Sequence, residues 1–302
     1  MKKKISIVIP MYFEEDMVNI CYREIKKVIN LKKYDYEIIF VDDGSQDKTL
    51  ELLEAIAKRN HKVKVISLSR NFGHQAAVSA GLTYVTGDAC VIIDADLQDP
   101  PEAIPEMLKL WESGYQIVYG KRKKRDGESF FKLFTAKLFY KILNKLSDIN
   151  IPKDTGDFRV IDKIVVDTIN NLKEHNKFLR GLYSYTGFKQ TAYLYERNPR
   201  KAGKTKYSLK KMLKLASDGI VGFSYKPLKL IIILSLFLAF ISVISLITTI
   251  IYKTFFYLLI FLFSFNTSII LFCIWLLSLY ISRIYDEVKN RPSYIINKTI
   301  NI

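Results

Sequence analysis

Two aspartates separated by one residue form the pattern in this sequence that most clearly suggests chemistry. Asp94 and Asp96 follow the short apolar stretch Cys90–Ile93, which is predicted to be a buried strand. Because side chains alternate along a strand, we expect the two carboxylates to point the same way. Such oxygen ligands suit Mg²⁺ or Mn²⁺, which takes water and substrate phosphate as its other ligands. The pattern indicates a site for a metal ion and a diphosphate, although a solvated turn explains many isolated Asp-x-Asp triplets.

Further polar clusters follow the other predicted strands of the first half of the chain. Strands are predicted at residues 5–10, 37–41, 63–68, 90–93 and 116–120. Helices are predicted between them, including one that begins with Asp99 as its N-cap, and this alternation is typical of a mostly parallel α/β sheet. Ligands of such sheets bind beyond the carboxyl ends of the strands. Polar clusters lie at four such ends, and we expect them to converge on one crevice: residues 10–14, 42–45, 70–75 and 94–98.

Two long uncharged stretches lie in the last third of the chain. Residues 230–252 and 254–282 carry no charged side chain, and each is longer than the ~20 residues that span a hydrocarbon core. Only Lys253 separates them, whereas basic residues flank the pair, so the positive-inside rule places both chain ends in the cytoplasm. We therefore expect a multi-pass protein of the cell (inner) membrane, with two transmembrane helices within residues 227–283 and a cytosolic tail at 284–302.

Two lysine-rich amphipathic segments precede the uncharged stretches. Residues 129–146 and 207–226 mix apolar and lysine side chains in a manner typical of helices that lie in the headgroup plane. A core helix with a rim of lysines is the alternative for the first segment. The second would be a juxtamembrane helix that follows a catalytic domain at residues 1–206.

The formal net charge of +16 raises the question of nucleic acid as a partner. No nucleic-acid-binding motif accompanies the charge, and much of the lysine lies near the membrane-proximal segments, where anionic headgroups attract it. We therefore expect a membrane partner and no nucleic acid. The cysteines Cys21, Cys90 and Cys273 lack metal-ligand spacing and are expected to be reduced thiols.

Six short motifs in this order resemble those of the polyisoprenyl-phosphate glycosyltransferases of glycosyltransferase family 2, such as dolichol-phosphate mannose synthases and bacterial undecaprenyl-phosphate glucosyltransferases. The motifs are Val8–Glu14, Val41–Ser45, Asn71–Gln75, Asp94–Pro101, Gly156–Arg159 and Gly203–Tyr207. The likeness covers nearly the whole chain. It implies a Rossmann-like GT-A catalytic domain on the cytosolic membrane face, with amphipathic interfacial helices and a C-terminal two-helix hairpin.

The resemblance also implies roles for individual residues. Asp94 and Asp96 would hold the metal, and Asp96 would also be catalytic together with Asp157, which matches the acid beside the reacting sugar. Whether Asp157 is a base, orients the acceptor or sugar, or pairs with Arg159 or Arg180 stays open. The residues implied to bind the nucleotide sugar are Pro10, Tyr12, Glu14, Asp43, Ala95, Gln98, Arg122, Arg200 and Lys206.

The reaction implied by the resemblance is inverting transfer of a hexose from a nucleotide diphosphate sugar to a polyprenyl phosphate, with Mg²⁺ or Mn²⁺ as cofactor. UDP-glucose and undecaprenyl phosphate are the first choices, and UDP-N-acetylhexosamine, a UDP-pentose and GDP-mannose are alternative donors. Processive polymerisation is disfavoured because Phe178–Gly181 lacks the Gln-x-x-Arg-Trp motif. The alternative from another class is a membrane-anchored protein that binds a nucleotide sugar without turnover. Assembly into a homo-oligomer is a family-based expectation.

Overall fold

The structure is a computed structural model of the 302-residue chain, and it describes residues 2–29, 33–123, 155–174, 177–196 and 255–302, with parts of 231–251. Both amphipathic segments predicted at 129–146 and 207–226 lie outside the described residues, as do Arg200 and Lys206.

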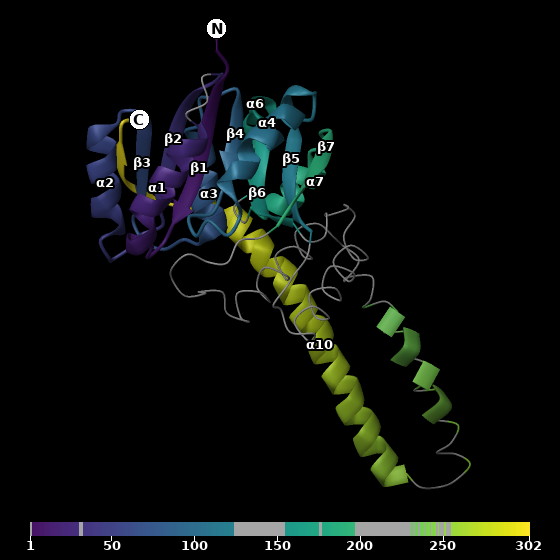
Figure 1. Cartoon of the computed structure of the whole chain (residues 1–302). Helices are drawn as coiled ribbons and strands as arrows, with labels where there is room; N and C mark the ends of the chain where they lie inside the picture. The colour runs from purple at the N-terminus through teal and green to yellow at the C-terminus, as the bar shows by residue number, and fades with distance from the viewer. Residues whose placement is uncertain are drawn as a thin grey trace.

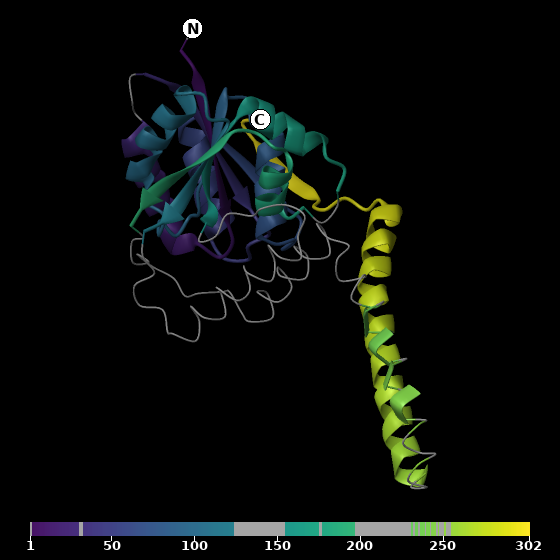
Figure 2. The same cartoon turned by 90° about the vertical axis from the view of Figure 1, so that its right-hand side faces the viewer.

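A single sheet of eight strands, with helices on both faces, forms the main body of the described chain (Figures 1 and 2). In chain order the described elements are β1 (Lys4–Met11), α1 (Glu15–Ile29), β2 (Asp35–Asp42), α2 (Thr49–Arg59), β3 (Val63–Leu68), α3 (His74–Thr83), β4 (Ala89–Ile92), the 3-10 helix η1 (Pro101–Ala103), α4 (Ile104–Glu112), β5 (Ile117–Arg122), β6 (Thr155–Asp162), α6 (Lys163–Asn171), α7 (Leu179–Tyr185), β7 (Gln190–Tyr195), α10 (Phe255–Lys289) and β8 (Ile296–Ile300).

The strand order is β7-β5-β6-β4-β1-β2-β3-β8. Strands β1 to β4 pair in parallel, as the alternating pattern predicts, and β5 pairs in parallel with β7. However, β6 lies between β4 and β5 and is antiparallel to both. The sheet is therefore mixed.

The sheet is buried on both faces because apolar side chains of different helices cover each one. Apolar residues of α1, α2 and α4 pack on one face, among them Met17, Leu53 and Trp111. Residues of α3, α6 and α7, such as Val78 and Leu182, pack on the other. Buried residues of β1 point alternately into the two layers, as expected for a strand covered on both sides.

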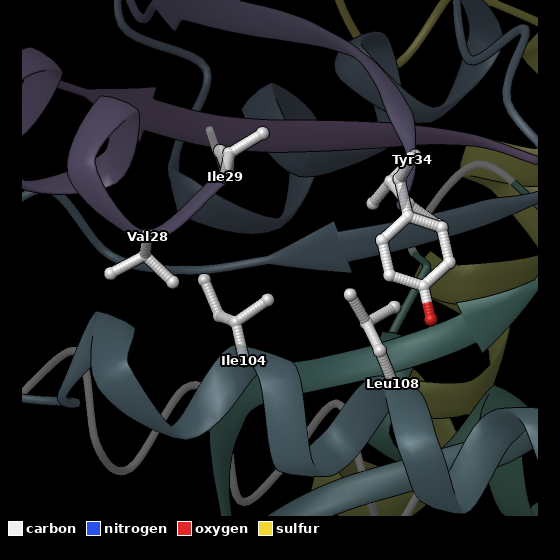
Figure 3. A pocket seen from close by; sticks show the side chains of 6 residues that line it. Val28, Ile29, Tyr34, Ile104 and Leu108 are labelled. Atoms are coloured by element: carbon white, nitrogen blue, oxygen red, sulfur yellow. The ribbon is translucent and has the colours of Figure 1, made fainter. Parts of the chain in front are cut away.

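An apolar pocket lies between the α1 end and α4, as Figure 3 shows. The residues that line it are Ile5, Val28, Ile29, Tyr34, Ile104 and Leu108. Ile5 is near the start of β1 and Tyr34 precedes β2, so the pocket lies at the amino ends of these strands. Its position and its lack of charged side chains separate it from the polar residues at the carboxyl ends.

The long helix α10 extends away from the sheet, and the chain then returns to it (Figures 1 and 2). Phe261–Lys289, with a mean hydropathy of 2.0, is the one helical segment of the described chain long and apolar enough to cross a membrane. After α10, β8 pairs antiparallel with β3, and Lys298 forms a 2.7 Å ion pair with Glu54 of α2. Residues 284–302, expected to be a cytosolic tail, thus contribute the end of α10 and an edge strand of the eight-stranded sheet.

Candidate active site

The loops that follow β1, β2 and β4 lie side by side because these strands are parallel neighbours. Pro10 and Met11 pair with Val41 and Asp42, so β1 and β2 end at the same level. The pairing of β1 with β4 ends at Val8. Pro10, which has no N–H to donate, therefore lies beyond the residues that pair with β4. The polar clusters that follow these strands are consequently brought to one edge of the sheet.

The carboxylates of two predicted site residues both act on the buried thiol of Cys21 on α1. Burial raises its pKa, and the carboxylates of Glu14 and Asp96 raise it further. Glu14 follows β1 and Asp96 follows β4, so both carboxylates lie near the same buried atom. The structure therefore brings the predicted nucleotide-binding and metal-binding loops together.

Asp94 and Asp96 lie in a turn beyond the strand rather than within it. Strand β4 ends at Ile92, and the N–H of Leu97 donates to the Asp94 carbonyl oxygen at 3.4 Å. The side chains nevertheless alternate, because Asp94, Asp96 and Gln98 are partly exposed whereas Ala95, Leu97 and Asp99 are buried. The two predicted metal ligands, Asp94 and Asp96, are thus both partly exposed, although they lie in a turn in which Leu97 has a φ of +52° and not in a strand.

The segment that contains Asp157 is a strand and not a loop. Strand β6 runs antiparallel to β4, with Ala89 opposite Asp162 and Ile92 opposite Arg159. Asp157 lies two residues before Arg159 on β6, and Asp94 lies two residues after Ile92, so both acids are just beyond the end of this pairing. The two predicted acids, far apart in the sequence, therefore meet because β6 inserts beside β4.

The sequence leaves Arg159 and Arg180 as alternative partners of Asp157, and the structure shows that Arg180 and, in addition, His74 contact it. Arg180 of α7 donates from Nε to Oδ1 at 2.8 Å and from Nη2 to Oδ2 at 3.0 Å. The Nε2 atom of His74, the first residue of α3, lies 3.1 Å from Oδ2 and 3.7 Å from Asp94 Oδ1. The Nη2 atom of Arg159 instead donates to the Gly156 carbonyl oxygen at 3.0 Å.

These contacts determine the charges at the centre of the site. Burial raises the pKa of Asp157, but Arg180 and His74 outweigh it and hold this pKa well below its usual range. Burial around Nε2 lowers the pKa of His74, but Asp94 and Asp157 raise it to about 9. Burial of Oδ1 raises the pKa of Asp94 to about 6, although His74 partly offsets this shift. At neutral pH, Asp157 is therefore a carboxylate held by cations.

Asp43 fixes the loop that leads to His74. Its carboxylate accepts hydrogen bonds from Phe72 N at 2.8 Å, Gly73 N at 2.9 Å and Asn71 Nδ2 at 2.8 Å. Gly73 has φ +101°, a conformation that side-chain-bearing residues rarely adopt, and α3 starts directly after it. Asp43 is 3% exposed, so in this structure it orders the loop as well as lying at the predicted nucleotide site.

The loop after β1 is held by the loop after β2. Phe13 N donates to Ser45 Oγ at 3.0 Å, and Glu14 N donates to Thr49 Oγ1 at 2.9 Å. Phe13 has a left-handed φ of +54° and packs edge-to-face against Tyr12, with ring centroids 4.6 Å apart. The predicted donor-binding segment is thus strained and partly exposed.

Arg122 belongs to a second charged cluster beside Gly156. Its Nη2 atom lies 3.9 Å from Asp99 Oδ1, and Tyr195 of β7 donates its hydroxyl to the same carboxylate. A Cβ atom on Gly156 would lie 3.5 Å from Arg122 Nη2, so the guanidinium is next to the Asp157 strand. The predicted N-cap role of Asp99 is wrong, because η1 begins only at Pro101 and the Asp99 carboxylate binds Tyr195 instead.

The carboxylates of Asp94 and Asp96 provide oxygen ligands of the kind that a divalent metal ion requires. Asp94 Oδ1 is buried and has no hydrogen-bond partner among the described residues, and Asp96 lies two residues further along the same turn. Two carboxylates fit an ion that keeps water and substrate phosphate as ligands. No group of three or more His, Cys, Asp or Glu side chains that could hold a metal occurs in the described part of the chain.

His74 is the site residue that sequence reasoning did not assign. Its signal was its position in the polar cluster after β3, where parallel strands place ligand-binding residues. Arg180 was considered only as a pairing partner of Asp157, and the structure confirms that pairing. Neither position can be placed beside Asp94 from the sequence, because the antiparallel insertion of β6 between β4 and β5 depends on tertiary contacts.

Comparison with known proteins gives consistent results. The family described as Glycosyl transferase family 2 matches residues 6–169. An uncharacterized glycosyltransferase of Bacillus subtilis (strain 168) is 48% identical, with 98% of this chain and 94% of the relative covered. A bactoprenol glucosyl transferase derived from prophage SfII of Shigella flexneri is 38% identical, with 98% of both chains covered.

Among solved structures, glucosyl-3-phosphoglycerate synthase from Mycobacterium tuberculosis, in complex with Mn²⁺, UDP-glucose and phosphoglyceric acid, has a similar fold. The TM-score is 0.50 at 19% identity, with 72% of this chain and 78% of the other covered. This likeness supports the GT-A-like fold alone. From the family match and its nearly full-length relatives, the chain belongs to glycosyltransferase family 2 and is a glycosyltransferase.

Proposed function

We propose that this enzyme transfers glucose from UDP-glucose to undecaprenyl phosphate, with inversion at the anomeric carbon. The observation that carries the proposal is the 38% identity to a bactoprenol glucosyl transferase over 98% of both chains. This likeness extends beyond the catalytic sheet into the apolar C-terminal region, which a lipid acceptor would explain. The choice of glucose as the transferred sugar rests on the name of the same relative, a glucosyl transferase.

The carboxylates at the carboxyl ends of the strands suit the departure of a nucleoside diphosphate. Asp94 and Asp96 would hold Mg²⁺ or Mn²⁺, which supplies charge neutralisation to the diphosphate. The loops of Pro10, Tyr12, Glu14 and Asp43 would bind the nucleotide, with Ala95 and Gln98 beside the diphosphate. Arg122, Arg200 and Lys206 are proposed to contact phosphate groups, because guanidinium and ammonium groups bind them well.

Asp157 is proposed to stabilise charge and orient groups rather than to remove a proton. A phosphate monoester has a second pKa of about 6, so the acceptor is largely dianionic at neutral pH and hardly needs a base. The transition state of glycosyl transfer has oxocarbenium character, and a nearby carboxylate stabilises it. The clamp by Arg180 and His74 keeps Asp157 ionised, which supports this role.

The path of the chain supports a membrane hairpin with both ends on the same side, and the basic residues that flank the uncharged stretches suggest that this side is the cytoplasm. Strands β7 and β8 belong to one sheet, and α10 lies between them. If α10 crosses a membrane, a chain that leaves this sheet and returns to it must cross an even number of times. The apolar stretch 230–252, of which the structure describes a short helix at Leu236–Ser245, is the proposed second crossing. Oligomerisation stays a family-based prediction.

Cysteine labelling tests this topology. We expect Lys253→Cys, in a Cys273→Ser background, to react in intact cells with a maleimide that does not cross membranes. Lys298→Cys on β8 is the matched control and should react only after lysis. Labelling of Lys253→Cys only after lysis would contradict the hairpin.

A donor panel tests the reaction. Full-length protein purified in detergent is incubated with undecaprenyl phosphate, Mn²⁺ and UDP-glucose, UDP-N-acetylglucosamine, a UDP-pentose or GDP-mannose, and the lipid product is identified by mass spectrometry. We expect a hexosyl lipid from UDP-glucose. A product from another donor only would keep the reaction class and change the sugar, whereas binding of UDP without any lipid product would favour the non-catalytic alternative.

A further inference from the structure

The three arginines near Asp157 differ in their burial and in the side chains that they contact. Arg159 is 4% exposed, and its guanidinium lies 4.1 Å over the ring of Tyr183. Arg122 lies against Asp99 and Tyr195. Arg180 has a side chain that is 20% exposed and contacts Asp157 itself. The Arg122 side chain is similarly exposed, at 18%, so what distinguishes Arg180 among these three is its contact with the Asp157 carboxylate.

A dianionic acceptor that approaches this centre would come near the Asp157 carboxylate. The proposed metal ion would offset the charges of Asp94 and Asp96 while it binds the donor diphosphate, but Asp157 lies outside that pair, and like charges in a partly buried site repel strongly. The attacking phosphate must nevertheless approach the sugar, which the same centre binds. A cation between the acceptor and Asp157 would remove this conflict, and an arginine matches phosphate geometry with two parallel donors.

The fold holds Arg180 in place from two sides. Asp157 receives two hydrogen bonds from its guanidinium, which fixes the plane of that group. The N–H of Leu179, the first residue of α7, donates to Gln75 Oε1 at 3.1 Å. Gln75 follows His74, so α3 positions both Asp157 and the helix that carries Arg180. A guanidinium oriented in this way loses little entropy when it binds an anion.

We propose that Arg180 binds the phosphate of the lipid acceptor and that Asp157 positions it for this contact. The inference rests on the proposed function, since it requires a phosphate acceptor. It assigns Asp157 a positioning role toward Arg180, in addition to its charge beside the sugar.

Acceptor kinetics test the proposal. The full-length enzyme in detergent is assayed with labelled UDP-glucose and Mn²⁺ while undecaprenyl phosphate is varied, for wild type, Arg180→Gln, Arg180→Lys and the control Arg59→Gln, an exposed arginine of α2. We expect Arg180→Gln to raise the acceptor KM about tenfold to hundredfold, the usual effect of losing a charged hydrogen bond. The KM for UDP-glucose should stay unchanged in Arg180→Gln. The acceptor KM of Arg180→Lys should lie between those of wild type and Arg180→Gln, and the acceptor KM of Arg59→Gln should equal that of wild type.

A double-variant cycle separates positioning from general damage. Asp157→Asn is expected to raise the acceptor KM. The double variant with Arg180→Gln should have no higher acceptor KM than Arg180→Gln alone, because both substitutions disrupt the same Arg180–Asp157 pair. UDP affinity measured by calorimetry should be preserved in Arg180→Lys, the variant that keeps the charge. A lower kcat at unchanged acceptor KM, additive effects, or parallel loss of UDP affinity would overturn the inference. A wild type that glycosylates no lipid phosphate but binds UDP would contradict the proposed function itself.

Discussion

The imidazole of His74 contacts the carboxylates of both Asp94 and Asp157, which lie just beyond the end of the β4–β6 pairing. The Nε2 atom of His74 is 3.7 Å from Asp94 Oδ1 and 3.1 Å from Asp157 Oδ2. One acid is the proposed metal ligand and the other lies at the proposed sugar position. His74 therefore links the two parts of the site that the reaction would use together.

Replacement of His74 is expected to slow transfer. In His74→Ala the two carboxylates lose the cation that contacts both, and their repulsion displaces Asp157, for which we expect a kcat about tenfold to hundredfold lower. His74→Gln, which keeps an N–H donor, should retain more activity. The control is His61→Ala, an exposed histidine before β3. Initial rates at saturating substrates measure the effect, and a wild-type kcat in His74→Ala would show that the link is dispensable.

The left-handed conformation of Phe13 is expected to cost stability. Its φ of +54° clashes sterically for a residue with a Cβ atom but not for glycine. Phe13→Gly and Phe13→Ala both lose the ring, and only the second keeps the steric penalty. We therefore expect the glycine variant to have a free energy of unfolding about 1 kcal/mol higher than the alanine variant. Denaturant unfolding measures the difference, and a more stable alanine variant would show that Phe13 is unstrained.

The sequence predicted the parallel half of the sheet well because its signals are local. Apolar runs that end in polar residues predict β1 to β4 to within a few residues, and the helix predicted between the first two strands is α1. The same reasoning indicated that Asp94, Asp96 and the β1 and β2 loops share an edge. These features depend on neighbours in the chain and on the parallel arrangement that alternating helices impose.

The antiparallel strands could not be predicted in this way. Strand β6 inserts between β4 and β5 although β5 ends at Arg122 and β6 begins only at Thr155, and this insertion brings Asp157 near Asp94. Strand β8 has the short polar sequence of a tail, and its partner β3 lies more than two hundred residues earlier. Such pairings are decided by tertiary contacts, which no local pattern records.

The buried Glu37 at the start of β2 is expected to make stability depend on pH. It is 2% exposed, and burial alone would raise its pKa, but hydrogen bonds from Lys4, Ser6 and Thr86 lower it from 4.5 to about 2. A lowered pKa in the folded state gives stability that is complete above the unfolded pKa and is lost as pH falls toward 2. The full contribution is about 3 kcal/mol.

The variant Glu37→Gln tests this pH dependence. The variant should have a lower free energy of unfolding than wild type at pH 7. This difference in free energy should become smaller as the pH falls from about 4.5 toward about 2. Glu106→Gln, which removes an exposed ion pair with Lys109, is the control and should have little effect. Unfolding followed by circular dichroism gives the comparison. A gap that does not change with pH would mean that the Glu37 charge is not responsible.

The C-terminal strand is expected to contribute to the stability of the catalytic domain. Asn301 Nδ2 donates to the carbonyl oxygens of Ala57 at 2.8 Å and Val63 at 2.9 Å, between α2 and β3. Asn301→Ala leaves both partly buried carbonyls without this donor, for which we expect a loss of about 1–3 kcal/mol. Lys298→Ala, which breaks only an exposed ion pair, should cost less than about 1 kcal/mol. Equal unfolding midpoints for the two variants would indicate that β8 is bound loosely.

Transfer of labelled glucose from UDP-glucose to undecaprenyl phosphate, measured for wild type and Asp94→Asn with Mn²⁺, tests the proposed site most directly. Asp16→Asn, an exposed acid of α1, is the control. We expect wild type and Asp16→Asn to form labelled lipid at equal rates. The rate of Asp94→Asn should be lower by at least about a hundredfold, because the departing diphosphate loses the charge stabilisation of the metal ion that Asp94 would hold. Labelled lipid formed by Asp94→Asn at the wild-type rate would contradict the placement of the reaction at Asp94.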